Sequence, residues 1–311
     1  MILRPLKILL ILEGITPIRL LSMKAPGCMG VVLLLAASCS LIGPDPVPEL
    51  HDGAPDTVYA TIEGSGNDSS TRVYLGEDIR LYWNADDRIS YFDKETYNYQ
   101  YRFSGNTGDR SGELKKVQTV FHTGQPLDHV CAIYPYDSRN AVDDGKDNYE
   151  TMTAWFPAEQ AYLEGSFGQG ANVMVAKSED SNLRFKNAGG YLCIKMYGEN
   201  VSVSSVSLRG NGNEPIAGKA HVRMDVGGTP ETTMDGSATG TVTVVCSDPV
   251  DLGPTAGEYT AFWFVIPPVT FNDGFTVTVQ TKEGGSFEKS TANSFDIKRN
   301  VITSMVPFEV L

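Results

Sequence analysis

Short runs that alternate apolar and polar side chains begin at Thr57 and continue almost to the end of the chain, and turn-forming Gly, Asn and Asp separate them. Alternation with a period of two is typical of strands that have one buried face. The clearest runs lie at residues 58–62, 79–83, 88–92, 201–208, 220–224, 240–246, 259–266 and 275–280. This pattern predicts an all-β protein.

A polar cluster at 178–182 is the best place to divide the 311 residues, which are enough for two domains. After this cluster, Leu192, Ile194 and Met196 share one face of a further strand. Several short strands in each half are typical of β-sandwiches. We therefore predict two sandwiches in tandem, at residues 56–182 and 183–311.

The first 38 residues have the order of an export signal. Lys24 precedes an apolar run at 31–37, and small residues then lead into Cys39. This order resembles the bacterial lipobox, in which a diacylglycerol is attached to the cysteine thiol and the chain is cut just before it. We predict that residues 1–38 are removed and that Cys39 is lipidated. The alternative is a signal peptide with another cleavage site and an unmodified Cys39.

Met23 is a better start for this leader than Met1, because the longer leader contains an interrupting Glu-Gly pair. Neither apolar run reaches the roughly 20 residues that a membrane-spanning helix needs. Residues 39–55 form a tether, and its prolines favour an extended backbone. An acylated Cys39 would hold this tether at the membrane.

The charge balance and the missing motifs exclude several functions. The chain has 25 Lys and Arg against 38 Asp and Glu, a net charge of −13, which disfavours nucleic acid as a partner. Its four histidines show no zinc-binding spacing, and the phosphate-loop, dinucleotide-binding and nucleophile-elbow motifs are absent. We therefore predict no catalytic residue, no cofactor, no metal and no enzymatic activity.

Some acidic residues leave alternatives open. The segment 143–150 bunches carboxylates and could hold calcium, but it lacks the alternate-position ligands of a calcium loop, so a solvated acidic loop is favoured. Asp86 and Asp87 near Trp83, and Glu159 near Trp155, are the places to look for a glycosidase pair. Their favoured interpretation is turn and loop acids beside core tryptophans.

Aromatic residues are candidates for glycan stacking, and cysteines are candidates for disulfides or metal ligands. Tyr97, Tyr99, Tyr101 and Phe103 fall on one face of a strand, which is favoured as a packing face over a glycan-stacking surface. Trp155 is a further glycan-stacking candidate. Three cysteines of the exported chain lie outside any Cys-x-x-Cys spacing, and we predict free, structural thiols. They are Cys131, Cys193 and Cys246.

Four stretches of the exported chain share landmarks with a known family. They are Thr71-Arg72 followed by 83–92, then 132–136 with 156–160, then 183–194, and finally 264–271 with 298–302. Together they resemble the fimbrillin family, the type V pilus subunits of Gram-negative gut and mouth bacteria. The resemblance implies two tandem transthyretin-like β-sandwiches in a lipoprotein of the outer membrane or the fimbrium. It also implies a structural or adhesive role.

The family further implies how such a subunit assembles. In its polymerising members an Arg-specific protease removes the first strand, and a strand from a neighbour fills the open groove. No Arg or Lys lies between Cys39 and Arg72, so Arg72 is the first possible cleavage site. The expected partners are other pilus subunits, the outer membrane through a palmitate-type anchor, and a host protein or glycan receptor. Thr57 fits an O-glycosylation pattern of these bacteria. A surface glycan-binding lipoprotein is the alternative function.

Overall fold

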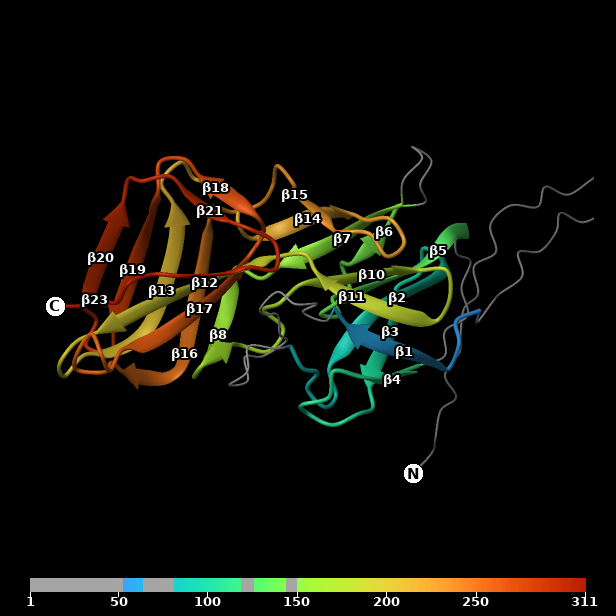
Figure 1. The fold of residues 1–311 in the computed structure, drawn as a ribbon, viewed down its shortest axis with the longest axis horizontal. Coiled ribbons are helices and arrows are strands. Elements are labelled where there is room, and N and C mark those ends of the chain that lie inside the picture. Colours follow the sequence, from blue (N-terminus) through green and yellow to red (C-terminus); the bar gives the residue numbers. More distant parts are fainter. Residues whose placement is uncertain (1–52, 64–80, 119–125, 144–149) are drawn as a thin grey trace, which may run out of the picture. The chain divides into compact units, whose positions relative to one another are not determined.

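The computed structural model describes residues 53–63, 81–118, 126–143 and 150–311, and in these ranges the chain forms strands and no helix (Figure 1). The predicted all-β class is confirmed. None of the described residues belongs to a helix that could cross a membrane.

Seven strands form a closed sheet in the order β1-β11-β10-β5-β2-β3-β4. Their bounds are β1 (Thr57–Ile62), β2 (Arg88–Glu95), β3 (Tyr99–Phe103), β4 (Ser111–Lys116), β5 (Pro126–Tyr134), β10 (Met174–Ser178) and β11 (Asn182–Asn187). Aromatic side chains fill its interior, including Trp83, Tyr101 and Phe185, which are fully buried. Strand β5 ends at Tyr134, directly before Pro135, which has no backbone N–H for a sheet.

A four-stranded sheet packs against part of the outer surface of the closed sheet. Its order is β15-β14-β7-β6, with bounds β6 (Ala141–Val142), β7 (Thr151–Phe156), β14 (Gly218–Arg223) and β15 (Glu231–Met234). Phe92 and Ile133 of the closed sheet share a buried cluster with Met152 and Val222 of the four-stranded sheet. Alternate residues of β2 and β5 therefore face two different cores.

Most of the remaining strands contribute to a third core. One sheet has the order β20-β19-β13-β16-β8-β9 and another has the order β17-β12-β22, with β23 also paired to β12. The bounds are β8 (Glu159–Leu163), β9 (Ser166–Phe167), β12 (Gly190–Tyr197), β13 (Ser202–Gly210), β16 (Thr241–Asp251), β17 (Thr260–Ile266), β19 (Phe275–Thr281), β20 (Ser286–Thr291), β22 (Ile302–Ser304) and β23 (Phe308–Glu309). Strands β18 (Val269–Phe271) and β21 (Phe295–Ile297) pair with each other. The predicted shared face of Leu192, Ile194 and Met196 is confirmed, because all three are buried in this core.

Strands from both sides of residue 182 occur in the same sheets. Strand β11 belongs to the closed sheet, β14 pairs with β7, and β16 pairs with β8. The division into 56–182 and 183–311 stays a prediction. One predicted strand is wrong in the part that the structure describes, because residues 81–83 are not in a strand. There Trp83 instead exchanges backbone hydrogen bonds with Gly108 and Asp109 of a turn.

The three cysteines of the described chain are free and buried, as predicted. Burial raises the pKa of the Cys131 thiol to about 12 and the pKa values of Cys193 and Cys246 to about 11. The thiols therefore stay protonated near neutral pH, where they act as small apolar core groups.

Candidate functional site: the seat of the first strand

Strand β1 is held on both sides by strands that are distant in sequence (Figure 1). It runs parallel to β11, with Tyr59 opposite Asn182, and antiparallel to β4, with Tyr59 opposite Glu113. No hairpin joins β1 to either neighbour. We call the position between β4 and β11 the β1 seat. An empty β1 seat would expose the backbone donors and acceptors of two strand edges.

The β1 seat takes small and medium apolar side chains at alternate places. Val58, Ala60 and Ile62 point into the aromatic core, where they are 2%, 0% and 5% exposed. Ala60 lies opposite Gly112, and a Cβ added to Gly112 would lie 2.8 Å from the Phe103 ring. The space beside Ala60 is therefore already filled.

Glu63 fixes the end of β1 to a segment near the C-terminus. Its Oε1 accepts hydrogen bonds of 2.8 Å from Nη1 of Arg299 and of 2.8 Å from the backbone N–H of Asn187. The Arg299 Nη1 also donates to the Asn187 carbonyl at 3.0 Å. The side chains of Glu63 and Arg299 are only 15% and 22% exposed, so this ion pair is largely removed from solvent.

A chain of amide hydrogen bonds continues from this ion pair into the core. The Asn187 side chain donates to Oδ1 of Asn300 and accepts from the side-chain amide of Asn172. The Tyr191 hydroxyl in turn donates to Oδ1 of Asn172 at 3.2 Å. Burial raises the pKa of Tyr191 well above its ordinary value, which keeps the hydroxyl protonated as a donor. This network of hydrogen bonds therefore helps to fix the position of Asn187 and its neighbour Arg299.

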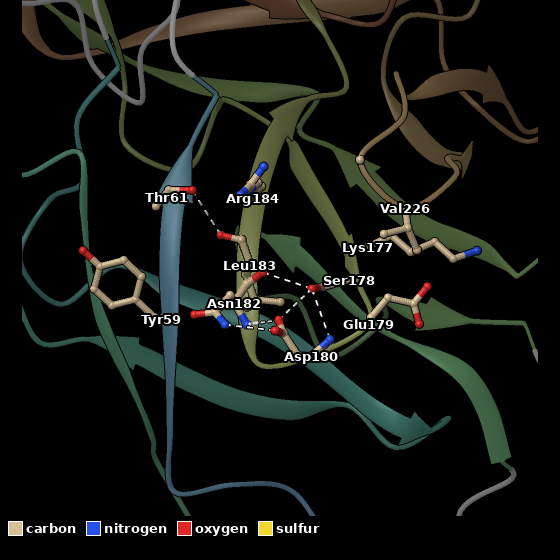
Figure 2. Close-up of a pocket in the computed structure, with 11 residues that line it drawn as sticks. Tyr59, Thr61, Lys177, Ser178, Glu179, Asp180, Asn182, Leu183, Arg184 and Val226 are labelled. Atoms are coloured by element: carbon tan, nitrogen blue, oxygen red, sulfur yellow. Dashed lines mark hydrogen bonds between the residues drawn. The ribbon is translucent and has the colours of Figure 1, made fainter.

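A groove of about 490 Å³ lies beside the β1 seat, on the outer surface of β1 and β11. Figure 2 shows Tyr59 and Thr61 on β1, Arg184 on β11, and Val226 on the opposite side. Lys186 fixes the loop beyond Val226 by donating to the carbonyls of residues 227 and 228. Tyr59 lines this groove and is 44% exposed.

Charged and amide groups line the turn at the groove's edge (Figure 2). Asp180 accepts hydrogen bonds from the backbone N–H of Asn182 at 2.8 Å and from its side chain at 3.1 Å. These bonds hold the pKa of the Asp180 carboxyl below its usual value. Glu179, Asp180, Lys177 and Arg184 give the lining both signs of charge.

Behind the groove, Glu150 forms a buried ion pair. Its Oε2 lies 3.0 Å from the ammonium of Lys177 and 3.0 Å from Nδ1 of His129, and its Oε1 accepts the backbone N–H groups of Asp128 and His129. The side chains of Glu150 and Lys177 are 5% and 7% exposed. The expectation of a solvated acidic loop is therefore wrong for Glu150. Residues 144–149 of that segment lie outside the described residues.

The residues predicted to mark processing and modification fall in different places. Cys39 and Arg72 lie outside the described residues, so lipidation and cleavage stay predictions. Thr57 is the first residue of β1, is exposed, and pairs with Lys115.

The aromatic candidates for glycan stacking are buried or packed against other groups. Tyr99 and Tyr101 are 2% and 0% exposed in the core, so the favoured interpretation as a packing face is confirmed. Tyr97 packs against the same core with its ring 4.9 Å from that of Tyr99. The guanidinium of Arg139 covers the Trp155 ring at 4.0 Å.

The acidic residues suspected of forming a glycosidase pair are Asp86, Asp87 and Glu159, and the first two make structural contacts. Asp86 lies in a turn with φ of 68° and pairs with Arg102 at 3.1 Å. Asp87 is buried and accepts hydrogen bonds from Asn84, Tyr134 and Gln169, while burial raises its pKa. Glu159 is exposed on β8, not in a loop. No group of three or more His, Cys, Asp or Glu within the described ranges could hold a metal.

Neither of the two partly buried ion pairs is predicted by the sequence. Glu63 and Arg299 are 236 residues apart, and Glu150 and Lys177 belong to different strands or their flanks. No spacing rule connects such residues. The only available signal was local, since both Glu63 and Glu150 flank a run of alternating residues.

No family model and no curated protein matches. Among solved structures, the chain is similar to a putative cell adhesion protein from Bacteroides ovatus, with a TM-score of 0.46 and 15% identity, covering 82% of this chain and 92% of that one. A putative cell adhesion protein from Bacteroides uniformis gives a TM-score of 0.42 and 16% identity over 80% and 93%.

The tip fimbrial protein Mfa3 from Porphyromonas gingivalis, with a C-terminal truncation, gives a TM-score of 0.31 and 8% identity over 75% of this chain and 81% of that one. These structural neighbours are described as cell adhesion and fimbrial proteins.

Proposed function

We propose that this chain is a non-enzymatic structural or adhesive subunit of surface fimbriae, anchored in the outer membrane through a lipidated Cys39 and assembling by β-strand addition. The observation that carries the proposal is the β1 seat, where a non-hairpin strand closes the sheet between β4 and β11. The export leader and the fimbrillin resemblance support it. Two tandem transthyretin-like sandwiches are the proposed finer description of the fold.

The position of Arg72 decides between two fates of the subunit. Arg72 follows β1 and is the first Arg or Lys after Cys39, so cleavage there would separate the lipid, the tether and β1 from the rest of the chain. We favour retention on the membrane as an anchor, tip or minor subunit, with a polymerised stalk subunit as the alternative. Pairing of β1 on both sides and the Glu63–Arg299 ion pair support retention.

The N-terminal residue of the protein purified from cells tests this choice. Mass spectrometry is expected to find acylated Cys39 first, and Cys39→Ala is expected to move the protein out of the membrane fraction. Arg72→Gln is the matched control and should leave both the N-terminus and the fractionation unchanged. Detection of Val73 as the first residue would contradict retention.

A second candidate function is saccharide binding in the groove beside β1. The observation that favours it is the exposed Tyr59 ring next to the Asn182 amide, the Asp180 carboxylate and the Arg184 guanidinium. An aromatic face can pack on the apolar face of a sugar while such polar groups bind its hydroxyls.

Tyr59→Ala tests this candidate against Tyr259→Ala, because the two tyrosines are 44% and 42% exposed. If the groove binds saccharides, Tyr59→Ala weakens binding to a glycan array by about ten-fold or more, and Tyr259→Ala leaves it unchanged. Equal effects of both variants, or no saccharide binding by the full chain, would exclude this function.

A further inference from the structure

We propose that Arg299 is a specificity-determining residue for the strand that fills the β1 seat. The strand must carry a carboxylate directly after its third inward side chain. The Arg299 guanidinium and the backbone N–H of Asn187 bind that carboxylate. This inference rests on the proposed strand addition and adds the chemistry of the accepted partner. In the intact chain Glu63 provides the carboxylate.

The donors of the carboxylate site are positioned by contacts outside β1. Both of its donors belong to parts of the chain other than β1, and the Asn187 carbonyl accepts from Arg299 at 3.0 Å. Next to Arg299, the N–H of Asn300 donates to the Gly189 carbonyl at 2.8 Å, and Asn300 adopts a left-handed φ of 59°. The turn that carries Arg299 is thereby fixed to the start of β12.

A strand without this carboxylate would leave charged and polar groups unpaired. The Arg299 side chain is 22% exposed, so solvent can replace only part of the lost interaction. Loss of a hydrogen bond to a charged group in such a place weakens binding by about ten-fold or more. An amide in place of the carboxylate keeps the shape but removes the charge that pairs with the guanidinium.

The β1 seat also limits the inward side chains. The inward side chains are a larger apolar residue at Val58, a small one at Ala60 and a larger apolar one at Ile62. Ala60 lies between Gly112 and Leu183 of the two neighbouring strands, which leave no space for a larger side chain. A strand with a larger residue at the middle place would overpack the core. The fitting partner is therefore an extended segment with this order and a carboxylate one residue after it.

The chain's own C-terminal run fits these requirements poorly. Glu309 takes the place of Glu63 only if Val306 takes the place of Ala60 and Pro307 lies within the strand. Proline has no N–H for the ladder, and valine is larger than alanine. In the structure this run instead pairs with β12 of its own chain, through β22 and β23. The C-terminal run of a second copy is therefore not the fitting partner.

Peptide exchange into the nicked full chain tests the inference. A specific protease site placed within residues 64–80 allows the chain to be cut after folding. Fluorescent peptides with the sequence of residues 55–63, extended by Gly-Ser and amidated, then compete for the β1 seat in sub-denaturing urea. The Glu63→Gln peptide is expected to bind about ten-fold more weakly than the wild-type peptide, while the exposed change Thr57→Gln has no effect.

The second arm uses the nicked Arg299→Met and Arg299→Lys chains, checked for folding by circular dichroism. The Arg299→Met chain should bind the wild-type peptide and the Glu63→Gln peptide equally, and the Arg299→Lys chain should keep part of the preference for glutamate. Equal binding of both peptides to the unaltered chain would overturn the inference, as would an unchanged preference in Arg299→Met. If no peptide enters the nicked chain, strand addition itself fails together with the inference.

Discussion

Replacing Lys177 with methionine should lower the free energy of unfolding by about 3–5 kcal/mol at pH 7.5, because it leaves the Glu150 carboxylate buried without its ammonium partner. The two side chains are 7% and 5% exposed, with 3.0 Å between Nζ and Oε2. Methionine keeps most of the lysine's length, so the loss reports on charge and not on a cavity. Urea unfolding followed by far-UV circular dichroism measures the change.

An exposed ion pair is the matched control for Lys177→Met. Arg102 lies 3.1 Å from Asp86, and their side chains are 53% and 71% exposed. Water screens such a pair, so Arg102→Met is expected to change the unfolding free energy by about 0–1 kcal/mol. A loss in Lys177→Met no larger than the loss in Arg102→Met would show that burial does not strengthen the Glu150 pair.

The same ion pair predicts a direction for the pH dependence of stability. Burial alone would raise the pKa of Glu150, but Lys177 and the backbone amides of His129 and Asp128 outweigh burial and hold that pKa below its usual 4.5. A carboxyl with a lower pKa in the folded chain stabilises the fold above the unfolded pKa. That contribution is lost as the pH falls below 4.5 toward the folded value. Lys177→Met should show a smaller loss over this acid range than the unaltered chain.

Local patterns in the sequence predicted most strands because alternation is a local property. The run at 88–92 lies in β2, and the run at 275–280 lies in β19, with one buried face in the second as expected. The pairing of strands is not local. Strand β1 lies parallel to β11 although Tyr59 and Asn182 are far apart in the chain, and no residue pattern states that pairing.

The same distinction applies to the candidate site. Alternation at Tyr99 and Tyr101 correctly predicts that they share a face, but the choice between a core and an open surface depends on what packs against that face. Glycan stacking by these two tyrosines was the alternative, but the exposed tyrosine that lines the groove beside β1 is Tyr59. The two donors that meet Glu63 lie 124 and 236 residues further along the chain, so only the folded arrangement reveals them.

Replacing Trp83 with alanine should lower the free energy of unfolding by about 3–5 kcal/mol, because it removes the largest side chain from the core of the closed sheet. Trp83 is fully buried, and its ring stacks on Phe103 with 5.3 Å between centroids. It also makes edge contacts with Phe185 at 5.4 Å. Such aromatic pairs add to the effect of buried area alone, and the interior cannot collapse onto so large a space.

Trp83→Phe separates ring packing from hydrogen bonding at this position. Among the described residues the indole Nε1 has no hydrogen-bond partner, so phenylalanine loses ring area only and should cost less than about half of the alanine value. Trp155→Ala is the matched tryptophan control. Its ring is only partly buried, beneath Arg139, so a loss of about 0.5–1 kcal/mol is expected. If Trp83→Ala costs no more than Trp155→Ala, the aromatic interior does not stabilise the closed sheet in which the β1 seat is formed.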